Sequence, residues 1–342
     1  LGLIGLVVGP VRAVSFPRDT MINALIREKL DLEPQPDKLW LGCELVHTSP
    51  DLISFYRKRG FDPVWVDRAG VNSLGRKLPG FLEETGLHGL NPEDYHLSCV
   101  RGLLEVLDKF QTRDGFDEPE RRPDPELLAQ FDILLTDGFL SSASHLSEGR
   151  VSPQTLYKQW LTTENKADII SRLASMNPDL DLQGIYEGFL PKCRRYKALL
   201  RAGQRLQSVH EQGGWGRLPA GGLLQHGDSG PRVAALKHRL YRRRLPDRGL
   251  DASRGYFDAR LEEAVRRFQA RHGIKIYGLV GKNTLAALNV SANERWKTVM
   301  LNLERLRWLS CDLERCYLVV NVADFSLTVY ENWHQAFSLK VI

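Results

Sequence analysis

The chain has 342 residues, of which 42% are hydrophobic and 26% are charged, and its formal net charge is +5. This length allows two or three domains with sizeable cores, and the composition excludes a disordered or fibrous protein. The excess of positive charge is too small to indicate a nucleic-acid-binding protein, and the arginine-rich runs at 194–205 and 242–244 are interpreted as solvated helix faces.

The first fifteen residues, LGLIGLVVGPVRAVS, form an apolar run that contains three glycines and a proline. These residues disfavour a buried helix, and the run is too short to span a membrane. Because Val11-Arg12-Ala13 places compact residues where a signal peptidase cleaves, we interpret residues 1–15 as the remnant of a secretory signal without its basic start. The sequence thus predicts export to the periplasm, with no stable membrane span in the mature form.

Residues 21–212 are expected to form a mostly helical domain, because apolar residues recur in it every three or four positions. Ser49-Pro50 begins one of these helices and Gly60 ends it. Gly, Pro and Asp punctuate the connections between helices. The predicted pieces are helices at 21–30, 51–60 and 124–146, an extended segment at 61–66 with a turn at 67–70, a connector at 86–97 and a loop at 112–125.

Four features of this region stand in the order seen in one family. They are the phrases FYRKRGFDPVWVD, GLHGLNPEDYHL and FDILLTDGFLSSASHLSEGRVSP, and the tryptophan at position 160. Taken together they resemble the scaffold domain of the YcbB-type L,D-transpeptidases. The Gly/Pro-rich stretch GGWGRLPAGG, residues 213–222, follows as a predicted linker, again in the order of that family.

Residues 227–289 predict three short helices around a small core. Asp228 or Ser229 can cap the first helix, whose first turn contains Pro231. Asp258 caps the second helix, and Gly273 provides its left-handed end. Apolar residues fall on one face of each helix: Val233, Leu236 and Leu240; then Leu261, Val265 and Phe268; then Leu285 and Leu288.

The sequence of this segment closely resembles that of a peptidoglycan-binding domain. The matching stretches are GDSGPRVAALKHRL, FDARLEEAVRRFQARHGI and YGLVGKNTLAALN. We place this domain at residues 223–290. The resemblance implies peptidoglycan as the partner, through its stem peptides and glycan strands, but it implies no reaction. Tyr256, Arg260 and Tyr277 are the candidate contacts for sugars and stem carboxylates, although structural packing would equally explain both tyrosines.

A helix at 291–310 is expected to connect this domain to a region in which the apolar residues alternate. Residues 315–342 predict three strands separated by turns at Ala323-Asp324 and Glu331-Asn332. ERLRWL followed by this meander resembles the opening strands of the L,D-transpeptidase catalytic domain. The sequence thus predicts a mainly α fold, with a helical scaffold, a three-helix peptidoglycan-binding module and a truncated β-meander.

No catalytic, metal or cofactor site is predicted within residues 1–342. In L,D-transpeptidases the nucleophile stands in a Ser-His-Gly-Cys phrase, which does not occur here and is expected beyond Ile342. Cys311, Cys316 and His334 lack that context, and the remaining cysteines, Cys43, Cys99 and Cys193, are not spaced as zinc ligands. The five cysteines are interpreted mainly as incidental thiols, although a disulfide between any two is compatible with export.

These resemblances together lead us to interpret the chain as a fragment, cut at both ends, of an exported YcbB-type L,D-transpeptidase. The family reaction forms 3–3 cross-links through a cysteine acyl-enzyme and needs no cofactor. A non-catalytic murein-binding protein, or the targeting portion of a cell-wall hydrolase, remains the alternative. A DNA-binding helical protein is supported only by the arginine-rich runs, and the predicted export argues against it. The oligomeric state cannot be predicted.

Overall fold

The computed structural model describes residues 18–34, 36, 38–42, 44–47, 49–67, 69–111, 123–158, 169–174, 182–241, 255–309, 315–322 and 325–341. The predicted signal remnant, Trp160, Cys43 and Cys311 lie outside these residues. The fold is mainly α, as the sequence predicts, and its sheets are small and antiparallel. The chain divides into two compact units, residues 1–193 with 304–342 and residues 194–303.

The first unit contains helices α1 to α8, two short hairpins and a three-stranded sheet. Its helices are α1 (Arg18–Leu30), α2 (Ser49–Lys58), α3 (Ser73–Glu84), η1 (Thr85–His88), η2 (Pro92–Tyr95), α4 (Leu97–Gln111), α5 (Pro125–Glu148), α6 (Pro153–Leu156), α7 (Ile169–Ala174) and α8 (Leu182–Glu187). Its strands are β1 (Leu39–Leu41), β2 (Glu44–Val46), β3 (Val66–Asp67), β4 (Gly70–Val71), β5 (Cys316–Asn321), β6 (Ser326–Glu331) and β7 (His334–Lys340).

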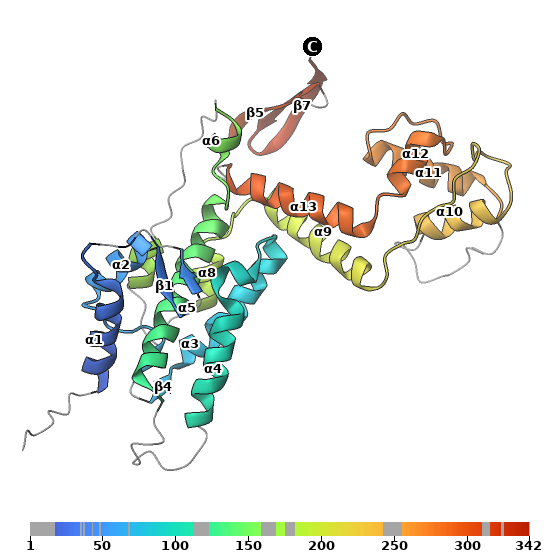
Figure 1. Cartoon of the computed structure of the whole chain (residues 1–342). Helices are drawn as coiled ribbons and strands as arrows, with labels where there is room; N and C mark the ends of the chain where they lie inside the picture. The colour runs from blue at the N-terminus through green and yellow to red at the C-terminus, as the bar shows by residue number, and fades with distance from the viewer. Residues whose placement is uncertain are drawn as a thin grey trace, which may run out of the picture. The chain divides into compact units, whose positions relative to one another are not determined.

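Helix α5 forms the centre of the scaffold and packs against α1, α2, α3, α4 and α7 (Figure 1). The Asp124 carboxylate accepts a hydrogen bond from the Glu126 amide, and Pro125 occupies the first turn, so the helix begins where capping rules predict. Gly138 lets α5 approach the connector closely, because a Cβ at this position would lie 2.7 Å from the Tyr95 carbonyl oxygen. The result is a large aromatic and aliphatic core around one helix.

Neighbouring short segments of the scaffold sequence pair to form two hairpins. The predicted extended piece and turn at 61–70 form β3 and β4, with Val66 paired to Val71. The Asn72 side chain accepts hydrogen bonds from the Leu74 and Gly75 amides and so caps α3. The second hairpin, β1–β2, pairs Leu39 with Val46.

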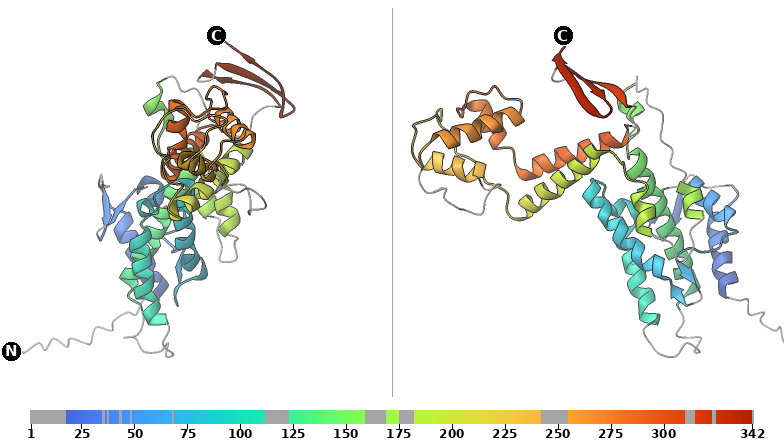
Figure 2. Two further views of the ribbon diagram at one scale, coloured as in Figure 1. Left: turned by 90° about the vertical axis from the view of Figure 1, so that its right-hand side faces the viewer. Right: turned by 180° about the vertical axis from the view of Figure 1, so that it is seen from behind.

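The second unit contains a pair of antiparallel helices and the three-helix module. Its helices are α9 (Arg194–Glu211), α10 (Pro231–Tyr241), α11 (Ala259–Arg271), α12 (Lys282–Leu288) and α13 (Ala292–Arg307), the last of which continues into the first unit. Helices α9 and α13 lie side by side in Figure 1 and in the right view of Figure 2. Gly203 permits this contact, because a Cβ there would lie 2.7 Å from the Met300 methyl group.

The module has its own small core, to which all three helices contribute. Val233, Leu261 and Leu288 are almost completely buried in it, as the predicted apolar faces require. An i, i+4 ion pair joins Glu262 and Arg266, with Oε1 and Nη2 2.7 Å apart. The residues predicted as a linker contribute Leu218 to this core.

Of the three helix-end predictions for the module, two hold and one does not. Asp258 caps α11 through the Leu261 amide, and Gly273 has a left-handed φ of 62°, both as predicted. In contrast, neither Asp228 nor Ser229 accepts a side-chain bond from the first turn of α10 in the described structure. The Asp228 carboxylate accepts instead from the Gln225 amide at 2.8 Å, because the chain turns back there before the helix begins.

The sheet β5-β6-β7 is an antiparallel meander, as the alternating pattern predicts. Its register puts six apolar side chains on one face. They form two rows across the strands, Leu318–Val329–Phe337 and Val320–Leu327–Leu339. The outer members of both rows are about half exposed, from 44% for Leu339 to 64% for Leu318.

Candidate functional site

The peptidoglycan-binding module is positioned by a network of short polar contacts around α11. Lys237 of α10 is almost completely buried, and its Nζ lies 2.9 Å from Asp258 Oδ2. Burial alone would raise the pKa of Asp258, but the Lys237 ammonium group and the amides of Leu261 and Arg260 outweigh it and lower that pKa. The cap of α11 thus stays ionised at neutral pH and ties α10 to α11.

The entry and exit segments of the module are joined by a clasp, defined here as Trp215, Leu218, Asn289 and Val290. The Leu218 amide donates to Asn289 Oδ1 at 2.8 Å, and Asn289 Nδ2 donates to the Leu218 carbonyl oxygen at 3.1 Å. Trp215 Nε1 donates to the Val290 carbonyl oxygen at 3.0 Å. The clasp closes the module at its base.

Two arginines lie over the indole ring of Trp215. The guanidinium carbon of Arg239 is 4.1 Å from a ring centroid and that of Arg295 is 6.0 Å away. Arg239 also donates to the Leu288 carbonyl oxygen and Arg295 to that of Ala287. These contacts hold two cations beside an aromatic surface.

The three residues predicted to contact murein all lie on the module surface. Tyr256 is 48% exposed and Tyr277 is 60% exposed, and Arg260 is exposed on the first turn of α11. Neither tyrosine is therefore used for core packing. The described residues show no hydrogen bond or ring contact that joins any two of the three.

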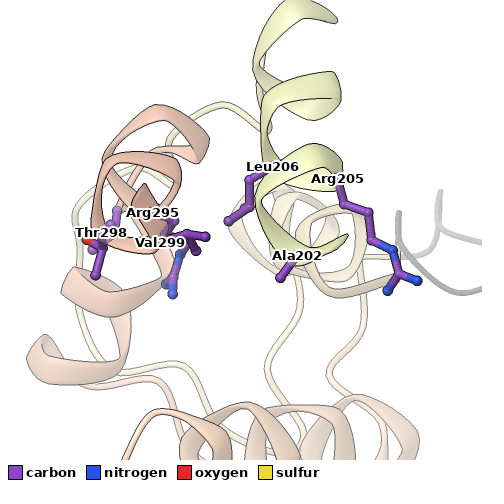
Figure 3. A pocket seen from close by; sticks show the side chains of 7 residues that line it. Ala202, Arg205, Leu206, Arg295, Thr298 and Val299 are labelled. Carbon is purple, nitrogen blue, oxygen red and sulfur yellow. The ribbon is translucent and has the colours of Figure 1, made fainter. Parts of the chain in front are cut away.

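A groove of about 660 Å³ lies between α9 and α13. Figure 3 shows Leu206 directed from α9 toward α13, with Val299 and Thr298 across the groove and Arg205 directed away from it. The five basic residues that the sequence analysis assigned to solvated faces between 194 and 205 are indeed exposed. This groove is lined mainly by the neighbouring faces of two helices, and its two cations are Arg205 of α9 and Arg295 of α13.

The scaffold contains a histidine between two carboxylates. His96 Nδ1 lies 2.8 Å from Glu44 Oε2, and His96 Nε2 lies 2.8 Å from Asp137 Oδ2. Burial lowers the pKa of His96, but the hydrogen bonds and charges of Asp137 and Glu44 outweigh burial and raise it. Because both ring nitrogens are used and the side chain is 1% exposed, the ring ties β2 to α5 and has no nitrogen for a substrate.

A second buried carboxylate, Asp132 of α5, holds the segment before β3. It accepts hydrogen bonds from the Tyr56 hydroxyl at 2.6 Å and from the Val64 and Trp65 amides at 2.9 and 2.6 Å. Burial raises the pKa of Asp132 to about 6, although these three donors oppose the shift. Sequence reasoning missed both acidic sites, because an acid in a helical stripe is normally a solvent-facing residue.

The cysteines and His334 do not form a nucleophile–base pair in the described structure. Cys316 begins β5, and Glu331 of β6 stands between it and His334 of β7 in the register. His334 Nδ1 lies 2.8 Å from the Asn332 carbonyl oxygen. Cys99 and Cys316 are thiols that form no disulfide, whereas Cys193 is disulfide-bonded, so for that cysteine the disulfide alternative holds in place of an incidental thiol.

Comparison with known families identifies both helical regions. Residues 50–202 match the scaffold domain family, and residues 229–288 match the peptidoglycan binding domain family. The chain has the architecture of the YcbB-type L,D-transpeptidases. Neither match extends beyond residue 288, and no curated protein matches the chain.

The second match supports peptidoglycan as a partner of this chain and indicates an association with the cell wall. Among the helices that the structure describes, none combines the length and the apolar character needed to cross a bilayer. The described residues also contain no group of three or more His, Cys, Asp or Glu that could hold a metal ion.

Proposed function

We propose that this chain binds murein and positions an L,D-transpeptidase catalytic domain on it, as part of an exported enzyme that forms 3–3 cross-links. The observation that carries the proposal is the order of its domains, a scaffold domain followed by a peptidoglycan-binding domain. A polymer-binding module raises the local concentration of substrate around an attached catalytic domain without contributing a reacting group.

The proposed reaction is an acyl transfer through a cysteine. Its thiolate attacks the carbonyl carbon before the terminal D-alanine of a donor stem, forming a thioester and releasing that D-alanine. The side-chain amine of a diaminopimelate on a second stem then attacks the thioester and restores the thiolate. Residues 1–342 contain no Ser-His-Gly-Cys phrase, so we assign this cysteine to catalytic-domain sequence beyond Ile342.

The apolar face of β5-β6-β7 supports a continuing β domain. Six apolar side chains share this face, and Leu318, Val320 and Phe337 are each at least half exposed. A sheet with one uniformly apolar face is stable in water only when another layer covers it. We propose that further strands of the catalytic domain form that layer.

Export to the periplasm is proposed on the N-terminal apolar run and on the disulfide at Cys193, because disulfides persist in oxidising compartments. For the wall contacts, we propose that the exposed rings of Tyr256 and Tyr277 stack on sugars and that Arg260 pairs with stem carboxylates.

Sedimentation with purified sacculi tests the proposal. The chain should sediment with sacculi, and replacing residues 214–290 by a short Gly/Ser turn between α9 and α13 should remove most of the bound fraction. A chain without residues 315–342 is the matched control and should sediment like the intact one. Equal sedimentation with and without the module would reject the module as the murein-binding part.

A second test concerns the missing nucleophile. Residues 1–342 should form no acyl adduct with a carbapenem, whereas a chain extended through the catalytic domain should form one. An activated thiolate and oxyanion donors are both needed for acylation, and Cys316 lacks a histidine partner in the described structure. Intact mass spectrometry measures the adduct. A stoichiometric adduct on Cys311 or Cys316 would place the catalytic centre within this chain.

A further inference from the structure

A pocket of about 530 Å³ opens beside Trp215 in the peptidoglycan-binding module. Four arginines line it, and we call it the arginine pocket: Arg239, Arg267, Arg271 and Arg295. None of the described lining residues is acidic, and Trp215 and Phe268 supply aromatic surface. The volume is in the range of small-molecule sites, about 300–1,000 Å³.

Two of the four cations are held in fixed positions. Arg239 and Arg295 lie over Trp215, and each donates to a backbone carbonyl oxygen at the C-terminal end of α12. His272 fixes Arg295 further, because its Nε2 lies 2.9 Å from Arg295 Nη1. An arginine can only donate, so Nε2 accepts and Nδ1 carries the proton that is donated to the Phe268 carbonyl oxygen at 2.7 Å.

The other two cations lie on the exposed face of α11. Arg267 and Arg271 are four residues apart, and Arg260 lies on the same stripe two turns earlier. Arg267 pairs with Glu263 at 3.7 Å, but both side chains are more than half exposed, so solvent screens that pair strongly. Arg271 has no ion-pair partner in the described part of the chain.

A neutral polar atom also remains without a partner at this site. The hydroxyl oxygen of Tyr241 is buried and has no hydrogen-bond partner among the described residues, although a buried hydroxyl normally has one. Burial raises the pKa of Tyr241, so the group remains a hydroxyl that can donate or accept. The arginine pocket therefore combines cationic donors, a neutral hydroxyl and aromatic surface.

We infer that the arginine pocket binds the carboxylates of a short acidic peptide with small aliphatic side chains, which in murein is the stem peptide. Guanidinium groups match carboxylates with paired donors, and the aromatic surface accommodates methyl groups such as those of alanine. A sugar ring carries no charge that would require four cations. This inference rests on the proposed murein binding and assigns the stem, rather than the glycan, to this pocket.

The probe is a synthetic stem tetrapeptide of alanine, γ-linked D-glutamate, diaminopimelate and D-alanine, titrated into the full chain by calorimetry. The double variant Arg267→Gln/Arg271→Gln should weaken binding at least about tenfold, since a hydrogen bond to a charged group contributes about 1.5–3 kcal/mol. The matched control Lys275→Gln/Lys282→Gln removes the same charge from two exposed positions outside the pocket and should bind like the parent chain.

Two further probes separate the sources of binding. The tetrapeptide with its carboxylates converted to amides should not bind, and inorganic phosphate at the same concentration should not compete. Equal binding of the amidated peptide, full competition by phosphate, or unchanged affinity in the arginine variant would each overturn the assignment. Thermal unfolding should be the same for all three chains, because the four replaced side chains are exposed.

Sedimentation with sacculi distinguishes the two proposals. If the parent chain sediments with sacculi but does not bind the tetrapeptide, murein binding stands and the stem assignment is rejected. If the parent chain does not sediment with sacculi, both are rejected. Reduced sedimentation of the arginine variant alone, with the lysine variant unchanged, would support both.

Discussion

The scaffold and the peptidoglycan-binding module use charged side chains in opposite ways. The scaffold buries Asp132, His96 and Asp137 completely or almost completely and surrounds them with hydrogen-bond partners. The module keeps its acids at helix caps and surface pairs, and it gathers arginines around a pocket. Buried charges fix one backbone arrangement, whereas accessible cations remain able to meet a ligand. The charged side chains of the scaffold therefore hold its backbone in place, and those of the module are available to bind a ligand.

The strongest test of this comparison is Asp132→Ala. It should lower the free energy of unfolding of the scaffold by at least about 3 kcal/mol, because three buried donors lose their acceptor and each unsatisfied donor costs about 1–3 kcal/mol. Denaturant unfolding measures the loss. The control Asp108→Ala removes an exposed acid that pairs with Arg76 and should cost less than about 1 kcal/mol. Equal effects would mean that burial does not distinguish the two acids.

Leu261→Ala tests whether the module has an independent core. Leu261 is fully buried there, so the substitution should destabilise the module by about 2–5 kcal/mol. Hydrogen exchange read out by mass spectrometry should show faster exchange in α10, α11 and α12 only. Faster exchange throughout α5 as well would show that the two cores unfold together.

The variant His96→Gln tests the comparison through the pH dependence of scaffold stability. The pKa of His96 is raised above its ordinary 6.5, so its contribution to stability is fully present below pH 6.5 and is lost as the pH rises through the folded-state value. The parent chain should therefore lose scaffold stability as the pH rises from 6.5, and the variant should lose less. Unfolding midpoints at several pH values give the slope. Identical slopes would contradict a charged His96.

The smallest effect is expected at the module surface. Glu263→Gln removes an i, i+4 pair whose atoms are 3.7 Å apart, and it should change stability by less than about 0.5 kcal/mol. Glu262→Gln should lower the free energy of unfolding slightly more, because Glu262 Oε1 lies only 2.7 Å from Arg266 Nη2. Thermal unfolding in low and high salt would compare them, and a large loss at Glu263 would contradict the exposed geometry.

Local signals in the sequence were sufficient to predict most of the module. The Asp258 cap and the Gly273 end each depend on residues within a few positions of one another. The same is true of the start of α5 at Asp124. These local capping interactions persist in the folded chain, because tertiary contacts add to them and do not replace them.

The polar centre of the scaffold could not be predicted in the same way. Asp132 receives its hydrogen bonds from residues 67, 68 and 76 positions away, and sequence periodicity carries no information about such partners. Trp215 was missed for a similar reason. Its glycine-rich surroundings are typical of a linker, yet its acceptor, Val290, is 75 residues away. The arginine pocket depends on this long-range contact, because it forms where Trp215 packs against α10, α11 and α13.

The clasp between Leu218 and Asn289 makes it easier for a domain to be inserted between α9 and α13 during evolution. Two hydrogen bonds hold the ends of a segment of roughly seventy residues together at the tips of α9 and α13. An unstructured insertion of that length in place of a short turn would cost the helix pair about 2 kcal/mol in closure entropy. A segment that closes its own ends spares the surrounding fold this cost. Helices α9 and α13 can therefore accept, lose or exchange such a domain during evolution as readily as a surface turn.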